Sequence, residues 1–187
     1  MVLASGNEHK LHELRHALPE WQLELLDVDI YPPESGATYY ENALGKARFG
    51  RTLTDAWVLG EDSGIEVAAL DGAPGVESAR WAEEPVAALL AELDRVADRR
   101  ARYVCELVAL GPDGGERRGT GVLEGTIAGE PRGTEGFGYD PIFVPDGETA
   151  TVAELGNAWK REHSHRARAA RALYASPAGG SSTGSRP

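Results

Sequence analysis

The sequence has little cysteine and no long apolar run. Its only cysteine is Cys105, so no disulfide can form within the chain, which is typical of proteins from a reducing compartment. A membrane-spanning helix needs roughly 18 consecutive apolar residues, and the N-terminus lacks the basic and apolar regions of a signal peptide. We therefore expect a soluble cytoplasmic protein in which Cys105 is buried in a strand.

Positive charge is also scarce. Lysine and arginine total 19 against 30 aspartates and glutamates, which gives a formal net charge of -11 at pH 7. An acidic protein is a poor unspecific binder of nucleic acid or of an anionic membrane. A small anionic ligand in a local basic pocket is still compatible with this charge, so a small molecule is the expected partner.

Short apolar runs alternate with amphipathic segments along most of the chain. This alternation, followed by two strands that pair directly, predicts a three-layer α/β/α fold with a mixed central sheet. We expect a single domain over 1–175 and a disordered Gly/Ser/Pro-rich tail over 176–187,. The expected strands are 1–5, 21–30, 57–64, 101–110, 117–129 and 139–145, and the expected helices are 7–18, 38–53, 85–97, 150–160 and 164–174.

The first segment with possible chemistry is Ser5-Gly6-Asn7, where a strand turns into a helix. A helix N-terminus offers free backbone N–H groups and the positive end of the helix dipole, so it suits a phosphate. Lys10 lies one turn further on and could point back to the same phosphate. The alternative is that Asn7 only caps the helix and that Lys10 is solvated.

Two other segments place acids where a metal could bind. Thr38 and Glu41 have the spacing of a capping box, but Glu41 could instead bind a metal or water, with Lys46 contacting a phosphate. Glu61 and Asp62 end a buried strand, which is where α/β sheets usually bind ligands. Buried acids need a cation, and oxygen ligands beside phosphates favour Mg²⁺. The alternative for Asp62 is an ordinary turn cap.

The last segment, 159–166, is rich in basic residues. Ser164 can cap the final helix, which leaves His165 and Arg166 in its first turn. Cations at that position oppose the helix dipole, so they suggest a use such as holding a base carbonyl or a phosphate. The alternative is a solvated basic helix end. His9, His12 and His16 are expected to be solvated, without zinc-binding spacing.

Together these segments resemble the inosine triphosphate pyrophosphatases, also known as dITP/XTP pyrophosphatases. The resemblance rests on five stretches in order, which are ASGNEHKLHEL, SGATYYENALGKA, EDSGIEVAALDGAPGVESARW, GTEGFGYDPIF and WKREHSHRARA. It implies a long mixed sheet with a cleft between two lobes, usually in a homodimer. It also implies Mg²⁺-dependent hydrolysis of ITP, dITP and XTP to the nucleoside monophosphate and pyrophosphate.

The resemblance also implies a role for each matching residue. Asp62 would bind Mg²⁺ and activate the attacking water, and Glu41 would support the metal. Phe137 would stack on the purine between its flanking glycines, and Asp140 would lie at the rim of the base and sugar site. The remaining substrate-binding residues would be Ser5, Gly6, Asn7, Lys10 and Lys46 at the phosphates, Ser63, Gly138 and Tyr139 beside the nucleoside, and Lys160, His165 and Arg166 at the base.

Three departures from the family pattern bear on the site. The family commonly has aspartate where this chain has Glu61, so the role of Glu61 is open. Many relatives have two acids where this chain has Pro33-Glu34, which makes Glu34 a weak metal ligand. The segment 81–103 is shorter than usual, which leaves the lobe shape and the dimer contact open. The alternatives are a Maf-like pyrophosphatase of other base preference and an inactive nucleotide-binding regulator.

Overall fold

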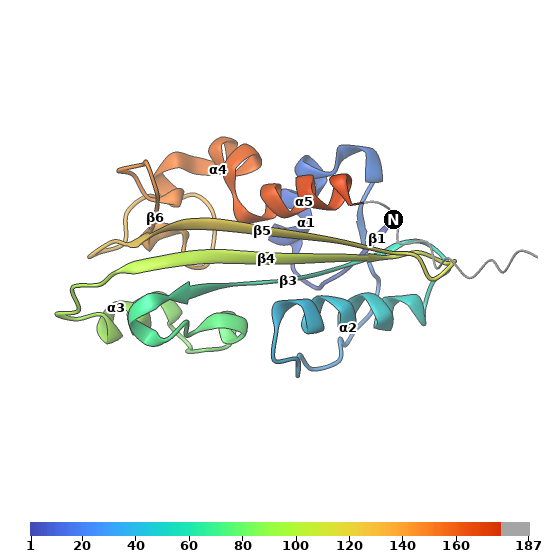
Figure 1. Ribbon diagram of the computed structural model, residues 1–187, viewed down its shortest axis with the longest axis horizontal. Helices are drawn as coiled ribbons and strands as arrows, with labels where there is room; N and C mark the ends of the chain where they lie inside the picture. Colours follow the sequence, from blue (N-terminus) through green and yellow to red (C-terminus); the bar gives the residue numbers. More distant parts are fainter. Residues whose placement is uncertain (177–187) are drawn as a thin grey trace, which may run out of the picture.

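A six-stranded mixed sheet runs through the molecule in the computed structural model, which describes residues 1–176 (Figure 1). The strand order is β2-β1-β3-β4-β5-β6, in which β1 is parallel to β2 and β3 and the other neighbours are antiparallel. The strands are β1 (Val2–Ala4), β2 (Glu24–Leu25), β3 (Val58–Val67), β4 (Arg100–Leu110), β5 (Glu116–Ile127) and β6 (Phe143–Pro145).

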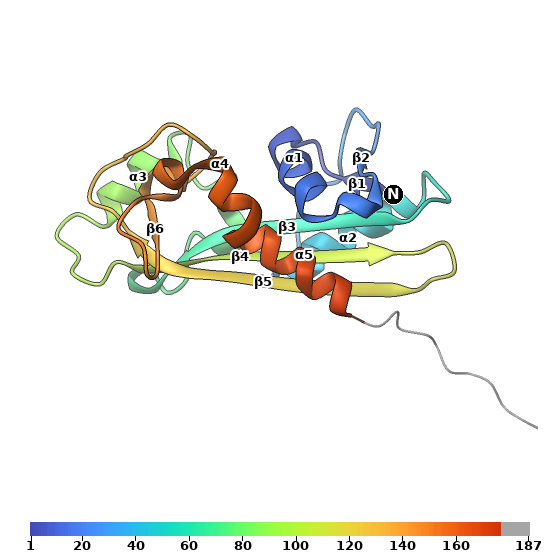
Figure 2. The same cartoon turned by 90° about the horizontal axis from the view of Figure 1, so that it is seen from above.

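Helices lie on both sides of this sheet. In Figure 1, α2 and α3 lie below the strands while α1, α4 and α5 lie above them. Figure 2 shows β3, β4 and β5 running most of the length of the molecule, with α1 toward one end and α3 and α4 toward the other. The α-helices are α1 (Glu8–Ala17), α2 (Tyr39–Arg51), α3 (Pro85–Glu92), α4 (Val152–His163) and α5 (His165–Ala175). The predicted mixed α/β fold is therefore confirmed.

Glycines let helices come close to both sides of the sheet. A Cβ atom on Gly60 would lie 1.9 Å from the Ala43 carbonyl oxygen of α2, and one on Gly121 would lie 2.0 Å from the His165 carbonyl oxygen of α5. Only glycine permits these approaches. Because successive side chains of a strand point to opposite faces, β3 directs Asp62 toward α2 and its neighbours Glu61 and Ser63 toward α1 and α5.

Apolar side chains pack against both faces of the sheet. One cluster joins α1 and α5 to the strands, a second fills the end near α3 and β6, and a third lies under α2. Cys105 belongs to the first cluster and is fully buried, as predicted. No helix within residues 1–176 is both long enough and apolar enough to span a membrane.

Several predicted boundaries are wrong. The strand expected over 21–30 is reduced to Glu24–Leu25, because its neighbour β1 offers only three residues for pairing. The helix expected over 85–97 ends at Glu92, shortly before Arg95 adopts a positive φ of 59°. The strand expected over 139–145 begins with a 3-10 turn at 140–142. The tail predicted over 176–187 lies outside the described residues except for Ser176.

Candidate functional site

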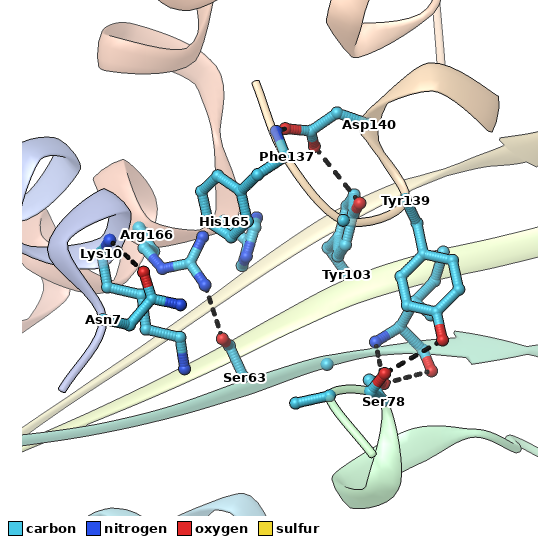
Figure 3. A pocket seen from close by; sticks show the side chains of 14 residues that line it. Asn7, Lys10, Ser63, Ser78, Tyr103, Phe137, Tyr139, Asp140, His165 and Arg166 are labelled. Carbon is cyan, nitrogen blue, oxygen red and sulfur yellow. Dashed lines mark hydrogen bonds between the residues drawn. The ribbon is translucent and has the colours of Figure 1, made fainter. Parts of the chain in front are cut away.

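A cavity of about 150 Å³ opens between the N-terminus of α1, the middle of β3 and the loop before β6 (Figure 3). It brings together side chains that are more than 150 residues apart in the sequence. Most of the predicted site residues line it, and five residues that were not predicted line it as well. The lining residues are Asn7, Lys10, Ser63, Gly64, Ile65, Ser78, Ala79, Tyr103, Phe137, Gly138, Tyr139, Asp140, His165 and Arg166.

The turn into α1 forms one wall of the cavity. The Asn7 side chain accepts hydrogen bonds from the backbone N–H groups of His9 and Lys10 at 2.9 and 3.2 Å, which confirms the capping interpretation. Ser5 supports the turn, since its hydroxyl accepts a bond from the Asn7 backbone N–H at 3.1 Å. Lys10 is not solvated: its ammonium lies 2.7 Å from a Glu61 carboxylate oxygen.

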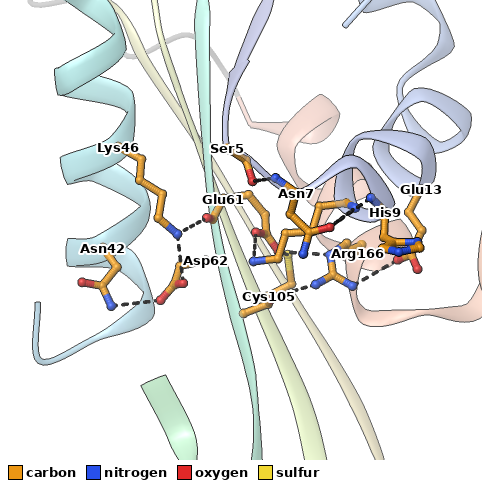
Figure 4. A network of polar contacts seen from close by, with 12 residues as sticks. Ser5, Asn7, His9, Glu13, Asn42, Lys46, Glu61, Asp62, Cys105 and Arg166 are labelled. Carbon is orange, nitrogen blue, oxygen red and sulfur yellow. Dashed lines mark hydrogen bonds and ion pairs between the residues drawn. The ribbon is translucent and has the colours of Figure 1, made fainter. Parts of the chain in front are cut away.

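Glu61 is the central anion of a buried polar network (Figure 4). It is fully buried, and its two carboxylate oxygens contact Lys10 and, at 3.0 Å, the Arg166 guanidinium. Arg166 also donates to the Ser63 hydroxyl at 2.7 Å. Burial opposes ionisation of Glu61, but Lys10 and Arg166 outweigh it and hold the pKa of Glu61 below its ordinary value,. Its role, which the sequence left open, is to bind these two cations together.

Asp62 lies on the opposite side of β3 and faces α2. Its carboxylate accepts a hydrogen bond from the Asn42 amide at 3.0 Å and contacts the Lys46 ammonium at 3.2 Å. Burial raises the pKa of Asp62, and the contact with Lys46 only partly offsets this effect because Glu61 raises the pKa further. Asp62 is therefore a buried carboxylate with one cationic neighbour and a raised proton affinity, as a catalytic base requires.

The acid that shares Lys46 with Asp62 is Glu34, from the loop before α2. Lys46 also donates to the Glu61 backbone carbonyl at 2.8 Å. Oxygen atoms of three residues therefore surround the Lys46 ammonium group. Such oxygen donors, completed by substrate phosphates, are the ligands that Mg²⁺ prefers, so these residues fit that ion. No group of three or more histidine, cysteine, aspartate or glutamate side chains within residues 1–176 forms a complete metal site.

The Glu41 carboxylate binds backbone groups at the start of α2 and has no hydrogen bond or ion pair with Asp62 or Lys46. Its carboxylate accepts hydrogen bonds from the backbone N–H groups of Ala37 and Thr38 at 2.7 and 3.1 Å. The Thr38 hydroxyl accepts one from the Glu41 N–H in return, which completes the predicted capping box,. Glu41 is exposed, and its carboxylate is held at the start of its own helix.

Asp140 is a buried anchor and not a residue of the rim. It is 3% exposed, and its carboxylate accepts hydrogen bonds from the Phe137 backbone N–H at 2.8 Å and the Tyr103 hydroxyl at 3.2 Å. The Lys160 ammonium lies 2.6 Å away. The predicted place of this carboxylate at the rim was wrong because the chain turns back on itself through Gly136 and Gly138, whose φ values are 81° and 61°,.

The Phe137 ring is surrounded by nitrogen-containing side chains. His9 stacks on it with 5.2 Å between ring centroids and an interplanar angle of 25°. The Lys160 ammonium and the Arg166 guanidinium carbon lie 4.6 and 5.2 Å from its centroid, within the range of cation–π attraction. His9 is an exposed residue of α1, as predicted, and its contact with Phe137 was not predicted.

His165 offers the cavity two unused polar atoms. It is 3% exposed, and neither ring nitrogen has a hydrogen-bond partner. Its ring is stacked on Tyr103 with 4.5 Å between centroids and an interplanar angle of 7°. Burial holds the pKa of His165 well below its ordinary value, and Arg166 lowers it further. The imidazole is neutral, so the expected conflict with the helix dipole does not arise at this residue.

Three histidines of α1 invite comparison with metal-binding helices. The segment 12–16, His-Glu-Leu-Arg-His, matches the H-E-x-x-H motif. In zinc helices with this motif, the two histidines bind the metal and the glutamate acts as a base. Here both histidines are exposed, whereas the glutamate is engaged by Lys160 and Arg166. The prediction that these histidines lack zinc-binding spacing was therefore wrong for His12 and His16, and in this structure the glutamate of the motif is held by two ion pairs.

The whole described chain is similar to known proteins. A model of the Ham1 family matches residues 1–176. The chain is 49% identical to a dITP/XTP pyrophosphatase of Symbiobacterium thermophilum, with 95% of each chain covered. It is 43% identical to another from Deinococcus deserti, with 94% of this chain and 88% of that one covered.

Two solved structures have the same fold. The Ham1 protein of Staphylococcus aureus matches with a TM-score of 0.81 at 35% identity, over 93% of this chain and 95% of that one. A nucleoside-triphosphatase (dITP/XTP pyrophosphatase) of Mycobacterium abscessus matches with a TM-score of 0.73 at 40% identity, over 92% and 96% of the two chains. The family model, which matches residues 1–176, includes every element that contributes to the cavity.

Proposed function

Because this chain belongs to the Ham1 family, we propose that it hydrolyses ITP, dITP and XTP to the nucleoside monophosphate and pyrophosphate, and so removes these nucleotides from the cellular pool. One observation carries the proposal. The buried, unpartnered nitrogens of His165 lie in the same cavity as Phe137 and Lys10, so base-binding and phosphate-binding groups share one site. The family match also leaves no support for the Maf-like alternative.

In this proposal the substrate lies along the cavity with its phosphates at the N-terminus of α1. The Gly6 backbone N–H and the Ser5 hydroxyl of the turn that Asn7 caps contact the phosphate oxygens, and the ammonium groups of Lys10 and Lys46 offset their charge,. Glu34 and Asp62 would hold Mg²⁺, which supplies charge neutralisation and polarises the phosphate oxygens. Asp62 orients a water molecule and accepts its proton, which its raised pKa favours,.

Selection among bases falls to the groups around Phe137. The ring stacks on any purine, which adds affinity but little selectivity. Lys160 and Arg166 are donors only, and the neutral His165 provides one donor and one acceptor. Donors suit the 6-oxo group of hypoxanthine and xanthine, whereas the amino group of adenine cannot accept from them and would leave the unpartnered donor of His165 without a bond. A buried unpaired donor costs about 1–3 kcal/mol, so we expect ATP to be disfavoured by roughly tenfold or more.

The experiment that tests this function separates the two possible products. The protein is incubated with Mg²⁺ and ITP, dITP, XTP, GTP or ATP, and pyrophosphate and orthophosphate are measured independently. We expect pyrophosphate as the direct product and faster turnover of ITP and XTP than of ATP. Stepwise release of orthophosphate, or equal rates with ATP and ITP, would contradict the proposal.

The metal ligands can be told apart by a pair of matched variants. Glu34→Gln should raise the Mg²⁺ concentration for half-maximal activity by roughly tenfold or more, because one of two carboxylates near Lys46 is lost,. Glu41→Gln should leave that concentration nearly unchanged and lower the free energy of unfolding by at most about 1 kcal/mol, since it weakens only a capping box,. If Glu41→Gln has the larger effect on the Mg²⁺ requirement, Glu41 is the metal ligand.

The remaining features of the proposal concern the whole molecule. We propose a single domain of two lobes with the cavity between them, a homodimer in solution and a location in the cytoplasm. The family resemblance supports the first two, and the lone, buried Cys105 supports a reducing compartment,. Light scattering would measure the oligomeric state, and a monomer at all concentrations would exclude the homodimer.

A further inference from the structure

Glu13, on the second turn of α1, contacts two cations of the base site at once. One carboxylate oxygen lies 2.5 Å from the Lys160 ammonium, and the other lies 3.1 Å from the Arg166 guanidinium. Its side chain is only 13% exposed. Through these contacts α1 is joined to α4 and α5, whose residues lie about 150 positions further along the chain.

No other carboxylate within residues 1–176 contacts both Lys160 and Arg166. Lys160 has a second partner in Asp140, and Arg166 has one in Glu61. Each of these two partners contacts only one of the two cations, whereas Glu13 contacts both. Two positive groups beside one ring repel each other, so an anion shared between them determines how close they lie.

Both cations also lie over the Phe137 ring, at 4.6 and 5.2 Å from its centroid. The position of each donor relative to that ring decides which base substituents it can reach. A change in the spacing of Lys160 and Arg166 would therefore alter which purine is accepted. The other anchors would persist, because Asp140 and Glu61 do not depend on Glu13 for their contacts.

We propose that Glu13 is a positioning residue that sets base specificity: it fixes the spacing of Lys160 and Arg166 around Phe137 without touching the substrate. The inference rests on the proposed function of the same site. The ligand class that this arrangement selects is a purine nucleotide with an oxo group at position 6. A residue that merely ties α1 to α4 and α5 would affect stability and all substrates alike.

The test uses Glu13→Gln, which keeps the shape of the side chain and removes its charge. In this variant kcat/KM is measured for ITP, XTP, GTP and ATP, and calorimetry measures the binding of IMP and AMP, which needs no turnover. We expect the ratio of kcat/KM for ITP to that for ATP to fall by about tenfold, and the preference for IMP over AMP to fall with it. The matched control is Glu20→Gln, which removes an equal charge from an exposed position just after α1 and should leave both ratios unchanged.

The outcomes separate this inference from the proposed function. Unchanged ratios in Glu13→Gln, or an equal loss for every nucleotide, overturn the role of Glu13. If the wild-type protein prefers IMP to AMP but releases no pyrophosphate, the proposed function fails and the calorimetric ratio still decides the role of Glu13. If the wild-type protein does not discriminate between IMP and AMP, the inference fails. Should Glu13→Gln not fold, Glu13→Asp is measured in the same way, since its shorter arm cannot span both cations.

Discussion

Replacing Asp62 with asparagine should reduce kcat for ITP by about 10²- to 10⁴-fold, which is the usual contribution of a positioned acid or base. The change removes the proton acceptor and one charge at the proposed metal site. It keeps the shape of the side chain and an oxygen for the Asn42 amide. Lys46 retains Glu34 and the Glu61 carbonyl as partners, so the free energy of unfolding should change little.

The measurement is pyrophosphate release at saturating Mg²⁺, together with urea unfolding of the same samples. Glu106→Gln is a suitable control, because Glu106 lies directly opposite Asp62 on β4 and on the same face of the sheet. Its carboxylate is bound by Arg118 and Thr120 and takes no part in the proposed reaction. The control should keep most of the activity. A near-normal rate in Asp62→Asn would remove Asp62 from its assigned role.

Glu61→Gln should lower the free energy of unfolding by about 3–5 kcal/mol, because breaking a buried pair leaves uncompensated charge in the interior. Lys10 would lose the only carboxylate it contacts within residues 1–176, and Arg166 would keep one carboxylate, Glu13, beside the Ser63 hydroxyl. This loss is a large part of the total for a domain whose stability is roughly 5–15 kcal/mol. Binding of ITP should weaken as well, since Lys10 and Arg166, which both line the cavity, would lose the carboxylate that they share.

The same residue predicts how stability depends on pH. The pKa of Glu61 in the folded protein is lower than its ordinary value of 4.5. Its contribution is therefore fully present above that value and is lost as the pH falls through the lowered pKa of the folded state. Wild-type protein should lose stability on acidification below about pH 4.5, and Glu61→Gln should lack that part of the loss.

Denaturant unfolding of the wild type and of two variants measures both effects. Glu66→Gln is the control, because Glu66 lies further along β3 and pairs with the half-exposed Arg102. A partly exposed pair of this kind contributes about 0–1 kcal/mol. If Glu61→Gln lowers the free energy of unfolding no more than Glu66→Gln does, the buried network does not stabilise the fold in the way that its geometry indicates.

Features that depend on neighbouring residues were predicted well. The Asn7 cap and the capping box of Thr38 and Glu41 join groups two or three residues apart. The pairing of β4 with β5 follows from two alternating apolar runs around one turn. Each of these structures is decided by backbone geometry and by side chains within a few positions, so its signal is contained in a short segment.

Residues of the site were identified more completely than their roles. Lys10, Phe137, His165 and Arg166 do line one cavity, but Asp140 is a buried anchor and His9 stacks on Phe137. Glu13 was not among the predicted site residues, and no short pattern around it points to the contacts that it makes. In the sequence it is one of several glutamates in helices. Only its contacts with Lys160 and Arg166 in the folded protein suggest a function for it.

The amino-acid sequence by itself determined the fold class, the caps of α1 and α2, the family resemblance and most of the residues that line the cavity. The tertiary structure alone decided which carboxylate meets which cation: Glu61 with Lys10, Glu34 with Lys46, and Glu13 with Arg166. The physical reason is that an acid's pKa and partners depend on the charges and burial at its tip. Those are set by the packing of elements distant in the chain, which no short segment records.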